Sequence, residues 1–143
     1  MATEYNNILS PADIYSDARG RIVALPDFPA AHSMIIESRV GAVRGNHFHN
    51  DESHLMYVVS GRMLYIEQQA DGTLSTLEVR PGSAVVSPRG VAHCTVFPEE
   101  TVIVVLSDVN RSGEHYEEHV FRVDALHHQV DLTGLYDGPQ VNP

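Results

Sequence analysis

Two short segments concentrate histidines at spacings suited to holding a metal ion. His47 and His49 lie two residues apart, and His54 follows a short polar turn. Residues i and i+2 of a strand share one face about 7 Å apart, so the first two imidazoles can converge on one ion. In the second segment, Pro88-Arg89-Gly90 turns the chain and His93 opens another predicted strand. Three or four imidazoles favour zinc, iron, nickel, copper or cobalt, whereas magnesium and calcium prefer oxygen ligands.

A simpler explanation exists for part of this pattern. A lone His-x-His pair also fits two exposed strand histidines, or one packed in a core. Four histidines framed by glycines and a proline favour a metal site over that explanation, with His47, His49, His54 and His93 as ligands. In the alternative, His54 faces solvent and only the other three bind.

This frame resembles the two motifs of the cupin superfamily. Gly41-x5-His47-x-His49-x4-His54-x6-Gly61 is similar to the first motif, and Gly82-x5-Pro88-x-Gly90-x2-His93 to the second, so the resemblance covers Gly41 to Phe97. It implies an all-β jelly-roll barrel with the metal inside it. His54 stands where cupins usually have glutamate, and Phe97 where they have asparagine. Four-histidine sets of this kind are similar to those of some single-domain cupin polyketide cyclases.

A finer resemblance concerns the segments Arg44–His49 and Tyr57–Gly61, which are similar to cupins of nucleotide-sugar and capsule-sugar metabolism. The resemblance also implies a homodimer. The length of 143 residues suits one cupin domain, residues 1–143. We expect its core at about 20–125, an N-terminal arm at 1–19 and a C-terminal tail at 126–143.

Composition narrows the partners and the compartment. The net charge of −10 argues against nucleic acid and anionic lipid. All nine basic residues are arginine, which excludes lysine chemistry. No apolar run reaches membrane-spanning length, and the N-terminus lacks a signal pattern. The single cysteine, Cys94, cannot form an internal disulfide, so we expect a cytoplasmic protein.

Short apolar runs bounded by glycine and proline predict a barrel or sandwich of strands. Ser60-Gly61 and Asp71-Gly72 predict hairpin turns. The segment from Pro11 to Arg19 is the one candidate for a helical turn or two. The clearest predicted strands are Met34–Val40, His54–Val59, Met63–Gln68, Ser83–Val86, His93–Phe97 and Thr101–Leu106.

The predicted ligands and their neighbours indicate the chemistry of the pocket. Replacing a carboxylate ligand by neutral His54 leaves a bound divalent ion its full charge, which makes it a stronger Lewis acid. Parity along the strands turns Phe97, Met56 and Val58 inward with the histidines, and together with Tyr65 they are the predicted substrate pocket. The candidates for a general base are Glu52, Tyr57, Tyr65 and Glu67, and the sequence does not place them inward.

Three functions follow, all with a small-molecule partner and one divalent transition metal, zinc first and iron or nickel as alternatives. The first is a non-redox isomerase, epimerase or cyclase of a keto-sugar or polyketide-like carbonyl compound, with the metal as Lewis acid. The second is an iron-dependent dioxygenase. The third is a small-ligand-binding cupin with a structural metal, which a closed tetrahedral site would support.

Two further histidine patterns do not indicate a functional site. His115 to His119 fits the H-x-x-E-H motif of some zinc proteases, but it leads into a predicted strand, so we interpret it as an acidic loop. The pair His127-His128 has no third partner nearby, and we interpret it as surface.

Overall fold

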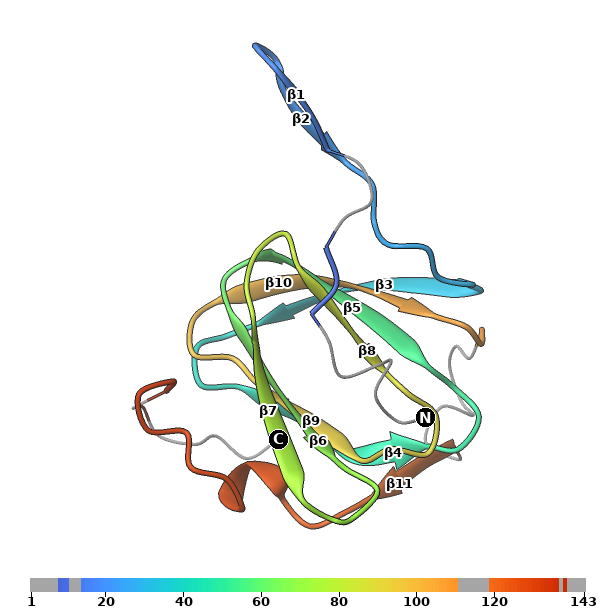
Figure 1. Cartoon of the computed structure of the whole chain (residues 1–143), viewed down its shortest axis with the longest axis vertical. Helices are drawn as coiled ribbons and strands as arrows, with labels where there is room; N and C mark the ends of the chain where they lie inside the picture. The colour runs from blue at the N-terminus through green and yellow to red at the C-terminus, as the bar shows by residue number, and fades with distance from the viewer. Residues whose placement is uncertain (1–7, 11–13, 111–118, 137, 139–143) are drawn as a thin grey trace.

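The computed structural model describes residues 8–10, 14–110, 119–136 and 138, and antiparallel strands dominate them (Figure 1). This confirms the predicted all-β jelly-roll architecture. Two sheets face each other and form the barrel. The first has the order β3 (His32–Ser38), β10 (Thr101–Ser107), β5 (His54–Ser60) and β8 (Ala84–Ser87). The second has the order β11 (Val120–Arg122), β4 (Val43–His49), β9 (His93–Val96), β6 (Met63–Gln68) and β7 (Leu74–Val79).

All six clearest strands of the sequence prediction form, with ends that differ by up to two residues. The turn at Asp71-Gly72 is a hairpin that pairs β6 with β7, as predicted. The hairpin predicted at Ser60-Gly61 is wrong, because β5 and β6 lie in different sheets and this turn carries the chain across the barrel. Strand β7 carries serine, threonine and glutamate among its apolar residues, which explains why its sequence gave a weak signal.

The N-terminal region forms a hairpin that projects from the barrel (Figure 1). Strands β1 (Ile14–Asp17) and β2 (Gly20–Val23) pair with each other. The helical turn predicted between Pro11 and Arg19 is therefore wrong for the described residues 14–19. Asp17 accepts a hydrogen bond from the backbone nitrogen of Arg19 at 2.9 Å, and Gly20 has a φ of 127°, which allows the chain to reverse instead of continuing as a helix.

Apolar residues fill three layers. The first lies between the sheets and includes Met56, Tyr65 and Phe97. The second covers the outer face of the second sheet beneath Leu126 and Leu132. The third covers the outer face of the first sheet beneath the N-terminal segment. Because both sheets are covered on both faces, β5 and β6 have nearly continuous apolar sequences rather than alternating ones.

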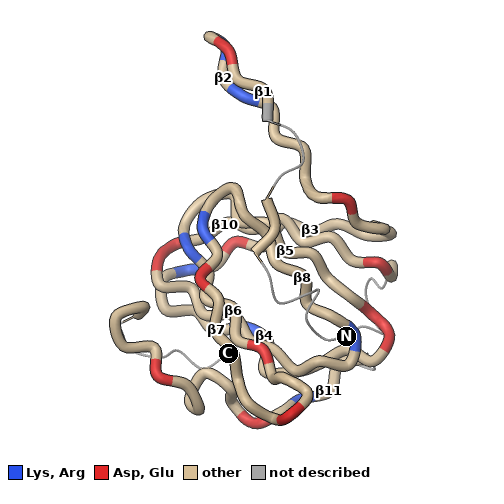
Figure 2. The backbone as a smooth tube through the Cα atoms, in the orientation of Figure 1, with Lys and Arg blue, Asp and Glu red and all other residues tan. Residues whose placement is uncertain are grey.

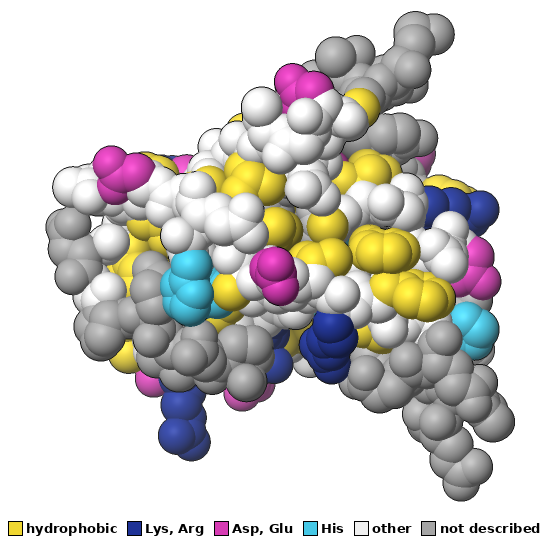
Figure 3. Space-filling model, turned by 90° about the horizontal axis from the view of Figure 1, so that it is seen from below, with side chains coloured by type: hydrophobic (Ala, Val, Ile, Leu, Met, Phe, Trp, Pro, Cys, Tyr) yellow, Lys and Arg dark blue, Asp and Glu magenta, His cyan; other side chains and the backbone are white. Residues whose placement is uncertain are grey.

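Most positions with charged residues lie around the outside of the barrel (Figure 2), while apolar side chains reach the surface on the face seen in Figure 3. Among the large apolar residues, Tyr15 and Ile22 on the projecting hairpin and Ile35 on β3 are exposed by 66%, 69% and 70%. In the part of the chain that the structure describes, no helix has the length and apolarity needed to span a membrane.

Candidate functional site

Three histidines from two neighbouring strands form the centre of the candidate site. The register places His47 of β4 opposite His93 of β9, and His49 follows on the same face of β4. One ring nitrogen from each lies within 4.8 Å of the others. The ring centroid of His47 is 4.7 Å from that of His49 and 5.0 Å from that of His93. The structure therefore brings together three of the four predicted ligands.

The fourth predicted ligand, His54, lies beside this group and is hydrogen-bonded to a carboxylate. Its ring centroid is 4.9 Å from that of His49. His54 Nε2 donates to Glu52 Oε2 at 2.7 Å, and the same oxygen accepts a hydrogen bond from Ser107 Oγ at 2.7 Å. The other oxygen, Glu52 Oε1, is 3.5 Å from His49 Nδ1. The buried Glu52 thus connects two of the four histidines.

Glu52 is ionised in this arrangement. Burial opposes its charge, but the hydrogen bonds from Ser107 and His54 outweigh that cost and lower the pKa of Glu52. A carboxylate that accepts from a histidine fixes the tautomer and orientation of the ring. The sequence did not place Glu52, because it lies in a turn where strand parity says nothing about direction.

The protonation of the group suits metal binding. Burial, with the neighbouring His49 charge as a smaller cause, lowers the pKa of His47 to about 4. Burial likewise lowers the pKa of His93 to about 3. Both rings are therefore neutral at neutral pH, which is the form that binds a metal. His93 Nδ1 lies 2.9 Å from Ser87 Oγ and 3.4 Å from the Val91 carbonyl oxygen, so a proton on Nδ1 leaves Nε2 with its lone pair.

This donor set fits a divalent transition ion. The nitrogens are close enough to share one ion, the rings of His47 and His93 are neutral at neutral pH, and the buried His47 Nδ1 has no hydrogen-bond partner among the described residues. Imidazole nitrogens suit zinc, iron or nickel.

Behind the histidines lies a second buried carboxyl group that the sequence did not place. Glu67 of β6 is paired in register with His93 and is 2% exposed. Burial raises the pKa of Glu67 to about 7. Burial and the neighbouring Glu67 charge also raise the pKa of Tyr65, whose ring stacks on that of His93 with centroids 6.0 Å apart. Because side chains alternate along a strand, the inward-facing Met63 and Tyr65 could have been used to predict that Glu67 also faces inward.

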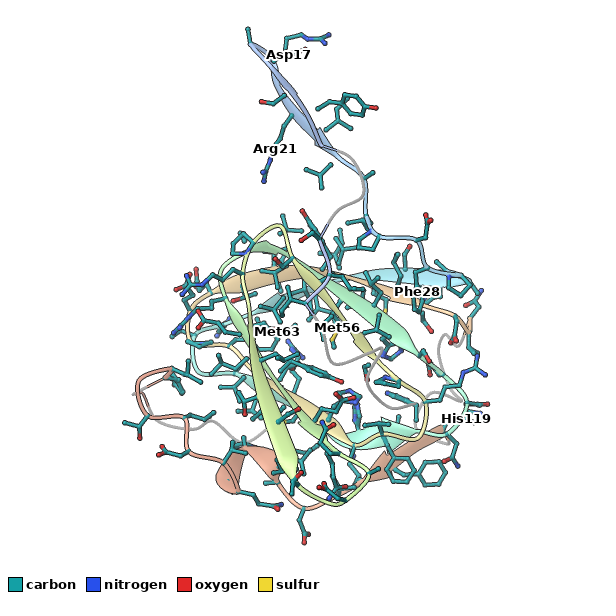
Figure 4. The ribbon with its side chains drawn as sticks, viewed as in Figure 1. Asp17, Arg21, Phe28, Met56, Met63 and His119 are labelled. Atoms are coloured by element: carbon teal, nitrogen blue, oxygen red, sulfur yellow. The ribbon has the colours of Figure 1, made fainter. Side chains whose placement is uncertain are left out.

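The histidines line a mainly apolar pocket of about 520 Å³ that opens between the sheets. Two of the predicted pocket residues, Met56 and Phe97, line it as well. The other two, Val58 and Tyr65, are fully buried in the apolar layer between the sheets and do not form its wall. Figure 4 shows Met56 among the side chains inside the barrel. Two arginines, Arg44 and Arg122, also line the pocket and give it positive charge in a strongly acidic protein.

Of the two remaining histidine patterns, one needs correction. The segment His115 to His119 lies outside the described residues except for His119 (Figure 4). His128 is exposed as predicted, but the surface interpretation of His127 is wrong. His127 is 2% exposed, because the 3-10 helix η2 (Leu126–His128) packs on the outer face of the second sheet.

Comparisons with known proteins agree with the fold. No curated protein matches the sequence significantly. A 3'-monoepimerase from Streptomyces bikiniensis, solved with dTDP-quinovose, has a similar structure with 18% identity, a TM-score of 0.77, and coverage of 95% of this chain and 78% of that one. A 3,4-ketoisomerase from Helicobacter canadensis has 17% identity, a TM-score of 0.68, and coverage of 81% and 89%.

A dTDP-4-dehydrorhamnose 3,5-epimerase from Sulfolobus tokodaii is similar in the same way, with 19% identity, a TM-score of 0.65, and coverage of 84% and 81%. At these identities the likeness concerns the fold. The family model of the cupins matches residues 7–133, which include both histidine motifs and every strand of the barrel. The chain belongs to the cupin family.

Proposed function

We propose that this protein is a non-redox isomerase or epimerase of a keto-sugar. The observation that carries the proposal is the group of three imidazoles, two buried and one half-buried, in the wall of a 520 Å³ pocket; burial lowers the pKa of two of them, His47 and His93. Similarity in fold to sugar epimerases and ketoisomerases supports the choice of substrate class. Arg44 and Arg122 in the pocket suit a substrate that carries phosphate, such as a nucleotide-linked sugar.

The proposed reaction transfers protons only and needs no oxidant. A base removes the proton from a carbon next to the carbonyl, and the electrons of the C–H bond form an enolate. In epimerisation the proton returns to the opposite face of the same carbon. In isomerisation the enolate oxygen gains a proton to give an enediol, the neighbouring hydroxyl group loses its proton to become the new carbonyl group, and the carbon-bound proton returns to the former carbonyl carbon. His47, His49 and His93 would hold a divalent ion, which would polarise the carbonyl group.

His54 and Glu52 are the pair that we propose to carry the proton. His54 lines the pocket, and its hydrogen bond to Glu52 stabilises the ring after it accepts a proton. The four-histidine ligand set predicted from the sequence competes with this role, since a ring that binds the metal cannot also accept the proton. Variants of His54 decide between the two roles.

The proposal is tested with TDP-4-keto-6-deoxyglucose, a ligand of one structural neighbour, in deuterated water. We expect NMR to show deuterium replacing hydrogen next to the C4 carbonyl in the presence of protein and zinc, iron or nickel. The rate should fall on addition of a chelator and in His93→Ala, while the exposed control His128→Ala should behave as the parent. Absence of exchange with every metal would overturn the isomerase proposal, and full exchange after chelation would overturn its metal dependence.

One observation favours a second candidate, an iron-dependent dioxygenase. A group of three histidines leaves more positions open for oxygen than a group of four. An oxygen electrode distinguishes the candidates, because the isomerase consumes no oxygen and its deuterium exchange proceeds equally well under argon.

We also propose that the protein is a homodimer and acts in the cytoplasm. The paired residues Tyr15 and Ile22 on the projecting hairpin support the dimer, because they expose a large apolar surface that a second copy would cover. An isolated two-stranded hairpin is also marginally stable in water. The buried Cys94 agrees with a reducing compartment.

A further inference from the structure

Strand β4 changes face within its length. Before residue 46, Val43 is opposite Val96 and Gly45 is opposite Cys94, on the outer side of the sheet. Arg44, between them, is opposite Thr95 and lines the pocket. If strict alternation continued, residue 46 would face the pocket and His47 would face outward with Val43. The site therefore depends on a break in the alternation.

Asn46 is that break. The register between β4 and β9 shifts between Gly45 and His47, so Asn46 is an extra residue without a partner on β9. Among the described residues other than glycine, Asn46 alone has a positive φ, 56°, in the left-handed region. After this bulge, His47 is opposite His93 and both His47 and His49 line the pocket. One inserted residue thus lets Arg44 and both histidines reach the same pocket.

The C-terminal segment holds the bulge through three hydrogen bonds. The backbone nitrogen of Leu126 donates to Asn46 Oδ1 at 2.8 Å, and the backbone nitrogen of Val123 donates to the Asn46 carbonyl oxygen at 2.9 Å. Asn46 Nδ2 lies 3.2 Å from His127 Nδ1 and donates to it when the ring carries its proton on Nε2. Asn46 and His127 are 7% and 2% exposed, so water does not readily replace these bonds.

We infer that Asn46 and His127 are a positioning pair, which fixes the bulge and thereby keeps His47 and His49 turned into the pocket. Neither residue touches the proposed substrate position, since both lie on the outer face of the sheet. The pair also makes the site depend on a segment 80 to 81 residues away in sequence. This inference rests on the proposed role of the histidines, and its test measures the environment of their rings without relying on activity.

The experiment uses the full chain with labelled histidine and records the ring signals of His47 and His49 by NMR without metal. In His127→Ala, we expect both signals to shift, because Asn46 loses its acceptor. The ring signals of the matched control His128→Ala should stay as in the parent. In His127→Asn, Oδ1 replaces Nδ1 as the acceptor, so the signals should return toward those of the parent.

Zinc titration gives a second readout. We expect His127→Ala to weaken zinc binding about tenfold, as loss of an orienting contact typically does. Asn46→Gly keeps the backbone freedom but loses the side chain, and its effect should not add to that of His127→Ala, since both remove one interaction. Ring signals in His127→Ala and Asn46→Gly that match the parent would overturn the inference. If His127→Ala does not fold, Asn46→Gly and His127→Asn decide in the same way. If the parent binds neither zinc, iron nor nickel but the signals shift, the metal proposal fails and the positioning pair stands.

Discussion

Buried titratable side chains respond to pH in opposite directions in this site. The lowered pKa values of His47 and His93 add stability above about 6.5, and that stability is lost as the pH falls through about 4 and about 3. The raised pKa of Glu67 works the other way. Its contribution is fully present below 4.5 and is lost as the pH rises through about 7. The fold therefore holds neutral rings and a readily protonated carboxyl group side by side.

The first prediction concerns Glu67. Glutamine resembles the protonated carboxyl group at every pH, so Glu67→Gln should match the parent near pH 5 and become more stable than the parent by pH 9. Thermal unfolding of the metal-free protein at pH 5, 7 and 9 measures the difference. A difference that is the same at all three pH values would show that Glu67 titrates normally in the fold.

The second prediction concerns His54. Because His54 Nε2 is occupied by Glu52, we expect His54→Ala to bind close to one metal ion per chain and to lose deuterium exchange. His93→Ala should lose the metal. Metal analysis and the exchange assay, run on both variants and on His128→Ala, check this. If His54→Ala loses the metal as His93→Ala does, His54 is the fourth ligand and cannot be the base.

At the scale of elements, the turns decide which sheet receives each strand. Gly61 carries the chain from β5 to β6 with a φ of 88°. A Cβ atom there would overlap the Glu100 carbonyl oxygen and the Thr101 side chain. Thr101 in turn accepts a hydrogen bond from the Arg62 backbone nitrogen at 3.0 Å. The turn that crosses between the sheets therefore packs directly against the residues at the start of β10 and leaves no room for a side chain at Gly61.

We therefore predict that Gly61→Ala destabilises the fold more than Gly72→Ala does. Gly72 has a nearly identical φ of 87°, but apart from its two chain neighbours no described residue has an atom within 4 Å of its missing Cβ. Gly72→Ala should cost about 1 kcal/mol for the left-handed backbone, and Gly61→Ala should cost more because the neighbouring backbone must move. Chemical denaturation measures both, and equal losses would show that the turn at Gly61 adapts easily.

For the whole molecule, the projecting hairpin is the feature that the barrel does not explain. Its exposed Tyr15 and Ile22 form a cross-strand pair. We expect light scattering to give twice the mass of the chain for the parent protein, and a lower mass for the double variant Tyr15→Ser with Ile22→Ser. Val40→Ser, exposed by 61% in the parent but outside the hairpin, should leave the mass unchanged. A parent that is a monomer at high concentration would contradict the proposed dimer.

The sequence by itself determined the fold class, most of the strands and the central histidines. Each rests on local geometry. Side chains two apart on a strand share a face, which is why His47 and His49 could be predicted to act together. Glycine and proline mark turns wherever the backbone must reverse, so the ends of β5, β6 and β9 came within two residues. The motif spacing around these histidines is dense enough to indicate the family.

Only the tertiary structure decided which face of the sheet those histidines occupy and which polar groups join them. The bulge at Asn46 depends on the register with β9 and on contacts from the C-terminal segment, far away in sequence. Glu52 and His127 are buried because distant strands and η2 cover them, and local patterns carry no information about what covers a residue. Burial makes their hydrogen bonds necessary, because a buried polar group must find a partner or give up its charge, and Glu52 keeps its charge through the hydrogen bonds from Ser107 and His54.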